Sequence, residues 1–300
     1  MEKKNEKRMI IIGGPTASGK TSVAIAAALH FDTEIISADS RQCYKELSIG
    51  VARPSAKELQ AVKHHFIASH SINETINARD FETFAMEKGS EIFKEKATAV
   101  MVGGTGLYIK AFCEGLDDMP TIPVQIHDQV VQDFQNNGIV WAQEEMATLD
   151  PIFFSTGEIK NPQRLMRAME VMRATGKSIL DFRKNKAASR PFDVIKIAVD
   201  LPKNELHQNI NSRVDAMVKE GLVEEVNGLT SSHHLNALNT VGYKEIFSYL
   251  KGQLSLEAAM EEIKKHTRQY AKRQITWFKK DKNFIWLQPK EILPYIKTLS

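Results

Sequence analysis

Residues 14–21 combine glycines, a lysine and hydroxyl groups at the spacing of a phosphate-binding loop. They fit the pattern G-x-x-x-x-G-K-[ST]. Glycines in such a loop let backbone N–H groups converge on an anion, and the following helix adds its positive N-terminal end. Lys20 supplies a charge for the terminal phosphate, and the Thr21 hydroxyl suits Mg²⁺. The diphosphate-binding loop is predicted to consist of Gly14, Pro15, Thr16, Ala17, Ser18, Gly19, Lys20 and Thr21.

A carboxylate and an amide follow the next apolar run, in the segment 39–42. Asp39 is able to take a proton from an attacking nucleophile, or to hold Mg²⁺ through water. Gln42 has the donor and acceptor that pair with an adenine edge. Taken alone, an Asp-Ser pair more often caps a following helix, so both interpretations of Asp39 and Ser40 stay open.

A second glycine-rich turn lies at residues 103–106 and carries Thr105. Its glycines would let a ligand approach the backbone closely, with the Thr105 hydroxyl at the same edge. A tight turn with close helix packing explains the same glycines equally well.

These loops need a scaffold, and the surrounding pattern predicts one. Short apolar runs at 9–12, 34–37, 98–102 and 194–199 alternate with helical patterns, beginning with a helix at 21–29. This indicates an α/β fold with a P-loop NTPase-like parallel sheet flanked by helices, in which ligands bind at the carboxyl ends of the strands. Asp39 would then lie near the phosphate loop if its strand neighbours the first one.

The middle of the chain has helical patterning and no convincing strand. We predict a helical insertion domain at 116–189, between two parts of the α/β core at 1–115 and 190–300. Residues 204–229 and 255–280 are expected to form long helices. The second of these carries many Lys and Arg residues and no acid across 264–280. Such a face, with Tyr270 and Trp277 interleaved, suits nucleic acid, although a solvated helix face with inward aromatics is the simpler interpretation.

Bulk properties exclude some classes of protein. The chain has 300 residues, a formal net charge of +3 and a pI of about 8.6, which alone does not indicate a nucleic-acid partner. Two cysteines, Cys43 and Cys113, and the lack of a membrane-length apolar stretch lead us to expect a cytoplasmic protein without a membrane partner. ATP is the commonest ligand of such a loop, so a small kinase remains an alternative. A motor ATPase is not supported, because the sequence has no long apolar strand that ends in Asp-Glu.

Together and in this order, these segments resemble the tRNA dimethylallyltransferase family, also called tRNA isopentenyltransferases or IPP transferases. The resemblance runs along nearly the whole chain. Besides the three loops above, the matching stretches are Pro162-Gln163-Arg164-Leu165 with Arg167-Ala168, Val241-Gly242-Tyr243-Lys244-Glu245, and Thr267-Arg268-Gln269-Tyr270-Ala271-Lys272-Arg273-Gln274 with Thr276-Trp277-Phe278.

The resemblance implies transfer of a dimethylallyl group from dimethylallyl diphosphate to N6 of the adenosine 3′ to the anticodon, position 37 of tRNA. The loop then holds the diphosphate of a prenyl donor rather than ATP. Asp39 is implied as the base, Thr105 as a hydrogen-bond partner of the adenine or its amine, and Lys20 with Mg²⁺ as the charges on the leaving group. Arg213 is implied to lie near the pyrophosphate.

The resemblance also implies how tRNA binds. The insertion would clamp the anticodon stem-loop, and the basic helix would lie along backbone phosphates, most simply in a monomer. The implied tRNA contacts are Asp39, Ser40, Arg41, Gln42, Thr105, His127, Gln163, Arg164, Leu165, Met166, Arg167, Arg268, Lys272 and Arg273.

Four residues depart from the family pattern: Asn161, Val51, Asn209 and His127 replace a usual Asp, Thr, Arg and Arg. They put tRNA preference in question rather than the reaction. Three alternatives stay open: an adenylate isopentenyltransferase acting on free nucleotide, a small P-loop kinase, and an RNA-binding protein without activity.

Overall fold

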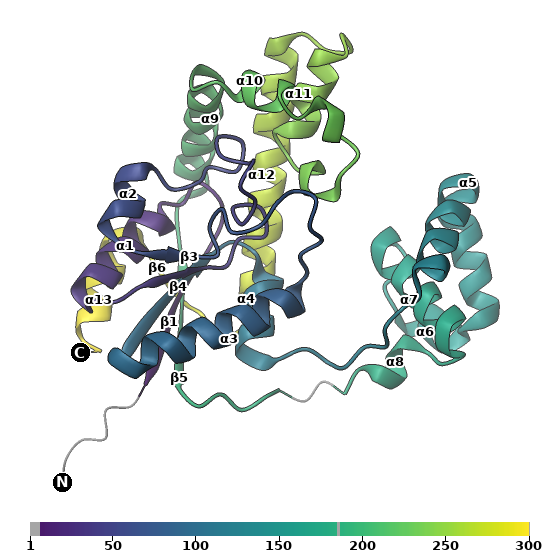
Figure 1. Cartoon of the computed structure of the whole chain (residues 1–300), viewed down its shortest axis with the longest axis horizontal. Helices are drawn as coiled ribbons and strands as arrows, with labels where there is room; N and C mark the ends of the chain where they lie inside the picture. The colour runs from purple at the N-terminus through teal and green to yellow at the C-terminus, as the bar shows by residue number, and fades with distance from the viewer. Residues whose placement is uncertain (1–6, 185–186, 300) are drawn as a thin grey trace. The chain divides into compact units, whose positions relative to one another are not determined.

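The computed structural model describes residues 7–184 and 187–299 and contains a six-stranded sheet (Figure 1). The strand order is β3-β2-β4-β1-β5-β6, and every pairing is parallel. The P-loop-like α/β fold predicted from the sequence is therefore confirmed. The strands are β1 (Arg8–Gly13), β2 (Ile35–Ser37), β3 (His64–His65), β4 (Thr98–Gly103), β5 (Asp193–Val199) and β6 (Ile285–Leu287).

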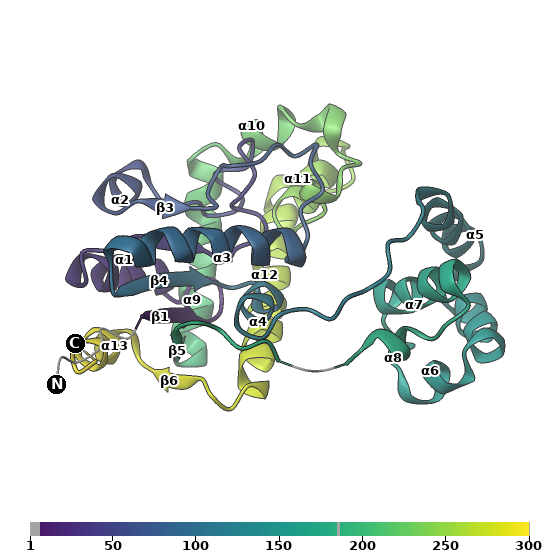
Figure 2. The same cartoon turned by 60° about the horizontal axis from the view of Figure 1, so that its bottom comes forward.

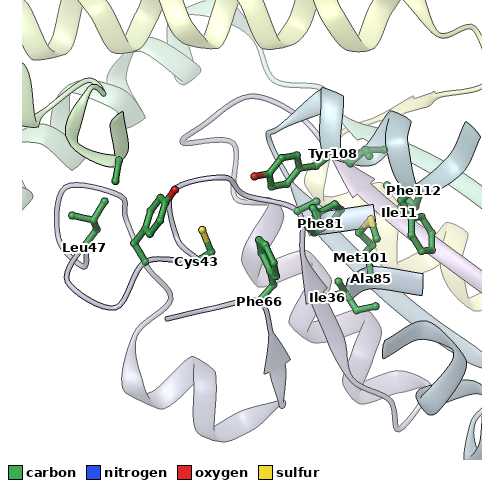
Figure 3. Close-up of a cluster of buried hydrophobic side chains, with 14 of the residues drawn as sticks. Ile11, Ile36, Cys43, Leu47, Phe66, Phe81, Ala85, Met101, Tyr108 and Phe112 are labelled. Carbon is green, nitrogen blue, oxygen red and sulfur yellow. The ribbon is translucent and has the colours of Figure 1, made fainter. Parts of the chain in front are cut away.

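Helices bury both faces of the sheet, which explains why its central strands are continuously apolar. Ile10 and Ile12 of β1 pack with α1 (Lys20–His30) and α13 (Pro289–Lys297). The alternate residues Met9 and Ile11 join a second cluster with α3 (Ala78–Glu95) and α4 (Gly106–Glu114). Figure 3 shows part of this cluster, in which Phe81 of α3 stacks on Tyr108 of α4 with ring centroids 4.5 Å apart. The two layers fix the ends of β1, β2 and β4, from which the loops of interest leave.

The remaining helices of this unit follow β5 or lie between β2 and β3. They are α2 (Ala56–Ala61), α9 (Lys203–Lys219), α10 (Leu222–Asn227), α11 (Tyr243–Leu250) and α12 (Leu256–Lys280), with 3₁₀ turns at Thr230–Ser232 and Asn236–Leu238. The prediction of one long helix at 204–229 is wrong, because Gly221 adopts a φ of 102° and separates α9 from α10. No helix in residues 7–184 and 187–299 is long and apolar enough to cross a membrane.

Residues 116–188 form a second compact unit, distinct from the unit of 1–115 and 189–300. Its described part is helical and has no strand: it contains α5 (Val124–Leu149), α6 (Pro151–Thr156), α7 (Pro162–Thr175) and α8 (Ile179–Phe182) (Figure 2). Gly138 kinks α5 with a φ of 77°. The unit has its own core, in which Phe153, Leu165 and Met169 are almost fully buried.

Candidate active site

The loop between β1 and α1 is shaped as an anion nest. Gly14 and Gly19 adopt φ values of 144° and 79°, and Ala17 between them also has a positive φ of 61°. A helix that starts at Lys20, directly after the loop, directs its positive end toward the same point. The Ser18 hydroxyl oxygen is buried and has no hydrogen-bond partner in the described residues. A buried polar group without a partner is costly, so this hydroxyl favours a polar ligand at the loop.

Two cations lie at this loop. Lys20 Nζ donates to the Pro15 carbonyl at 3.0 Å, and Arg213 of α9 donates to Thr16 Oγ1 at 3.4 Å. Desolvation lowers the pKa of Lys20 to about 8, with the charge of Arg213 acting in the same direction and Asp39 opposing it. A bound anion would restore the charged form of the lysine. The loop is therefore electrostatically prepared for a diphosphate.

Asp39 lies just beyond β2, in a turn rather than at a helix cap. Its Oδ1 accepts hydrogen bonds from the backbone N–H groups of Arg41 and Gln42 at 2.9 and 3.2 Å. The next helix is α2, which Ser55 caps, so the helix-cap interpretation of Asp39 is wrong. Both backbone bonds use one carboxylate oxygen. The turn therefore holds the carboxylate through Oδ1 and not through Oδ2.

We expected Asp39 to lie near the phosphate loop on the condition that its strand, β2, neighbours β1. The structure does not meet that condition. Strand β4 lies between β1 and β2. Asp39 and the phosphate loop nevertheless line one cleft of about 970 Å³ within the α/β unit. That volume is in the range of sites for cofactor-sized ligands. The carboxyl ends of three strands therefore converge on a single site.

The glycine turn after β4 owes its composition to close packing. A Cβ on Gly103 would lie 2.1 Å from the Ala38 carbonyl oxygen, and one on Gly104 would lie 2.2 Å from Gln274 Nε2. The Thr105 hydroxyl oxygen accepts a hydrogen bond from the Ser40 N–H at 3.0 Å. The packing interpretation left open from the sequence therefore applies to the glycines, and Thr105 contacts the segment that carries Asp39.

A carboxylate outside every predicted motif holds the wall of the cleft that residues 48–52 form. Glu225 of α10 accepts backbone N–H bonds from Ser48, Ile49 and Gly50 at 2.8–3.0 Å and a hydroxyl bond from Tyr243 at 2.6 Å. Sequence reasoning missed it because a glutamate on a short helix carries no distinguishing spacing.

Gln42 also supports this wall. Its amide donates to the carbonyls of Val51 and Ala52 at 3.2 and 2.9 Å, so the side chain is held by the loop in the free protein. Val51, which departs from the family pattern, thus holds Gln42 through its backbone carbonyl, and its side chain packs against the core.

Helix α12 lines the cleft with part of its basic segment. Tyr270 is 37% exposed, lines the cleft and lies under the Arg273 guanidinium, 5.8 Å from its ring centroid. Lys272 is exposed, whereas Arg268 donates to Asn211 at 2.8 Å. Of Tyr270 and Trp277, only Trp277 packs inward, against Gly106.

The predicted tRNA-contact residues of the insertion differ in exposure. Gln163 and Arg164 are exposed at the start of α7, where Asn161 accepts the Arg164 N–H and so caps the helix. Leu165 is fully buried in the core of the insertion. Its side chain therefore has no surface with which to contact RNA.

Other predicted residues of this group are tied to a buried acid. Glu170 accepts from Arg167 at 3.0 Å and pairs with His127 at 2.8 Å. Met166 is half-buried beside the same core. Asn209, in the α/β unit, donates to the Ala17 carbonyl and so supports the phosphate loop despite lacking the usual charge.

The described residues contain no group of three or more His, Cys, Asp or Glu side chains that could hold a metal. Thr21 and Asp39 nevertheless line the cleft beside the loop. This donor set fits a hard cation that is brought largely by diphosphate oxygens, as is usual for Mg²⁺.

Comparison with known proteins identifies the family of this chain. The IPP transferase family model matches residues 42–281. The tRNA dimethylallyltransferase of Christiangramia forsetii is 47% identical over 294 residues, covering 97% of each chain. The full-length tRNA isopentenylpyrophosphate transferase of Bacillus halodurans is 30% identical, with a TM-score of 0.72 and coverage of 98% of this chain and 96% of that one. A eukaryotic dimethylallyltransferase solved acting on tRNA shares the fold, with a TM-score of 0.79 at 24% identity over 94% of this chain and 74% of its own. The chain belongs to the IPP transferase family.

Proposed function

We propose that this enzyme transfers a dimethylallyl group from dimethylallyl diphosphate to N6 of adenosine 37, next to the anticodon of tRNA. The observation that carries the proposal is one cleft lined by both the anion nest with Lys20 and the turn carrying Asp39. Family membership supports the same reaction. Lys272 is exposed and is not among the residues that line the cleft, so a free nucleotide bound in the cleft would leave it without a phosphate partner, whereas an RNA backbone would supply one.

The phosphate loop acts on the leaving group. As the C–O bond of the donor breaks, negative charge grows on the departing pyrophosphate. Lys20, Arg213 and the backbone N–H groups of the loop stabilise that charge, because they are already oriented in a partly desolvated site. Mg²⁺, held by the diphosphate and the Thr21 hydroxyl, would supply further positive charge on the same oxygens.

Asp39 acts on the nucleophile. The exocyclic amine of adenine is conjugated with the ring, so it attacks carbon only if its proton is removed as the C–N bond forms. The outer oxygen of Asp39 takes that proton, while Oδ1 stays fixed by the two backbone N–H groups. The adenine must leave its stack to reach this oxygen, as in other enzymes that modify bases.

The RNA contacts come from both units. On α12, Lys272 and Arg273 face solvent and suit backbone phosphates, and Tyr270 offers a stacking face. In the insertion, the exposed Gln163 and Arg164 suit the anticodon stem-loop. We further infer that the enzyme works as a monomer in the cytoplasm, where unmodified tRNA is available.

The lowered pKa of Lys20 predicts that donor binding weakens in alkaline solution. Above pH 8 the neutral amine predominates in the free protein, whereas bound diphosphate favours the charged form. Binding then requires uptake of a proton, so affinity falls as pH rises. Between pH 7.5 and 9 we expect about an eightfold loss of affinity for dimethylallyl diphosphate, measured by calorimetry. The Lys20→Arg variant should show a flat profile, and a flat profile for the wild type would refute the contact.

The proposed function is tested by offering two acceptors in parallel. The protein is incubated with Mg²⁺, dimethylallyl diphosphate and either unmodified tRNA or AMP, and digested nucleosides are analysed by mass spectrometry. We expect prenylated adenosine from tRNA, and none from a tRNA with guanosine at position 37. Product from AMP alone would move the enzyme to free nucleotides. A further incubation with ATP in place of dimethylallyl diphosphate covers the kinase alternative: a phosphorylated acceptor there, with no prenylated product in the other reactions, would make the protein a kinase.

A further inference from the structure

One polar side chain in the centre of the site is not used by the reaction as described so far. Gln274 of α12 is 6% exposed and makes two hydrogen bonds across the cleft floor. Its Oε1 accepts the backbone N–H of Thr16 in the phosphate loop at 2.8 Å. Its Nε2 donates to the Gly104 carbonyl in the turn after β4 at 3.0 Å. One amide therefore joins two of the three loops that form the site.

The contact continues from Gly104 to the third loop. Thr105, the next residue, accepts the backbone N–H of Ser40 at 3.0 Å, and its own N–H donates to Ala38 at 3.2 Å. Ser40 and Ala38 flank Asp39. Hydrogen bonds of 2.8–3.2 Å, together with the peptide link between Gly104 and Thr105, thus connect the diphosphate loop through Gln274 to the backbone on both sides of the carboxylate.

The chemistry of the side chain suits this position. Thr16 presents a donor and Gly104 presents an acceptor, and only an amide offers both partners from one planar group of this length. Glycine at position 104 leaves space for the Gln274 side chain, because an added Cβ would lie 2.2 Å from Nε2. The backbone conformation does not itself require glycine there, since φ of Gly104 is not positive. The turn therefore lacks a side chain in order to admit Gln274.

We propose that Gln274 is a positioning residue of the transfer reaction, which keeps the diphosphate loop in register with the loop that carries Asp39. The inference rests on the proposed function. Substitution attack requires the amine, the carbon and the leaving oxygen to be aligned, and a displacement of about 1 Å costs on the order of 10²-fold in rate. Gln274 sets that alignment through the two loops, because both of these hydrogen bonds are made to their backbone.

The first test separates rate from binding. We expect Gln274→Ala to lower the single-turnover transfer rate by about 10- to 100-fold while pyrophosphate affinity changes by less than about threefold. Gln274→Glu, which keeps the acceptor for Thr16 but loses the donor for Gly104, should lose a similar factor. Gln253→Ala, at an exposed position in the turn between α11 and α12, is the matched control and should keep the wild-type rate. A loss that appears wholly as weaker pyrophosphate binding would overturn the proposal.

The second test asks whether Gln274 acts through Asp39. In an Asp39→Asn background the alignment of the base no longer matters, so Gln274→Ala should cost less than about threefold there. Full additivity of the two losses would contradict the path. Gly104→Ala gives an independent perturbation: it should slow transfer in the wild type, but much less in Gln274→Ala, where the space is free.

A third measurement needs no acceptor and therefore stands apart from the proposed function. Pyrophosphate should slow amide hydrogen exchange at Ser40 in the wild type and have no such effect in Gln274→Ala. If pyrophosphate does not change the amide exchange rate of Ser40 in the wild type, the two loops are not coupled. If it responds but no tRNA product forms, the coupling stands and the proposed acceptor is wrong.

Discussion

Asp39→Asn is expected to lower the transfer rate by about 10²- to 10⁴-fold, the usual contribution of a positioned general base. Asparagine keeps an oxygen for the N–H groups of Arg41 and Gln42, so the turn should survive. The amide nitrogen, however, takes the place of the oxygen that receives the proton. The measurement is the single-turnover rate with saturating tRNA and dimethylallyl diphosphate.

The control for this variant is Asp32→Asn. Asp32 is an exposed carboxylate paired with Lys96, outside the cleft, and its positive φ of 46° suits asparagine equally well. We expect no change in rate there. If the Asp39→Asn rate stays within tenfold of the wild-type rate, another group takes the proton. If the variant loses pyrophosphate affinity together with rate, Asp39 acts on the metal instead.

Lys20→Met is expected to lower kcat/KM for dimethylallyl diphosphate by about 10²- to 10³-fold, the cost of removing one oriented donor from developing charge. The loss should appear in both affinity and rate, because the ammonium contacts the diphosphate before and after the bond breaks. Steady-state kinetics with varied donor, together with pyrophosphate titration, separate the two contributions.

The stability of the same variant gives the control. Because the pKa of Lys20 is lowered from 10.5 to about 8 in the folded protein, its charge opposes folding at neutral pH. This contribution to the free energy of unfolding rises with pH between about 8 and 10.5, where only the unfolded chain holds the proton. Lys20→Met should therefore fold at least as stably as the wild type at pH 7. A clear drop in its melting temperature would mean that the kinetic loss reflects damage to the loop.

Local patterns were enough to predict the elements of the core and the phosphate loop. Strands β1, β4 and β5 are six or seven residues long and mostly apolar, so the hydrophobic pattern identifies them, whereas the three-residue β2 is indicated only by the apolar pair Ile35 and Ile36. β3 and β6 are only two and three residues long, and their pairing partners rather than their composition make them strands.

Relations between distant segments could not be predicted in the same way. Nothing in the sequence near Asp39 indicates that β4 separates its strand from β1. Gln274 lies among Lys and Arg residues in a segment interpreted for its charge, and its importance depends on Thr16 and Gly104, more than 150 residues away in sequence. Glu225 was missed for the same reason, since its partners are backbone N–H groups of a remote loop.

The position of β4 between β1 and β2 determines the distance between the two loops that form the site. Neighbouring strands lie about 4.8 Å apart, so the diphosphate loop and the Asp39 turn start on strands separated by roughly 10 Å. Between a phosphate held at one end and a base at the other, that span accommodates a leaving oxygen, a reacting carbon and an amine in line. Adjacent strands would halve this separation. Strand β4, which carries neither the phosphate loop nor Asp39, therefore sets how far apart these two parts of the site lie.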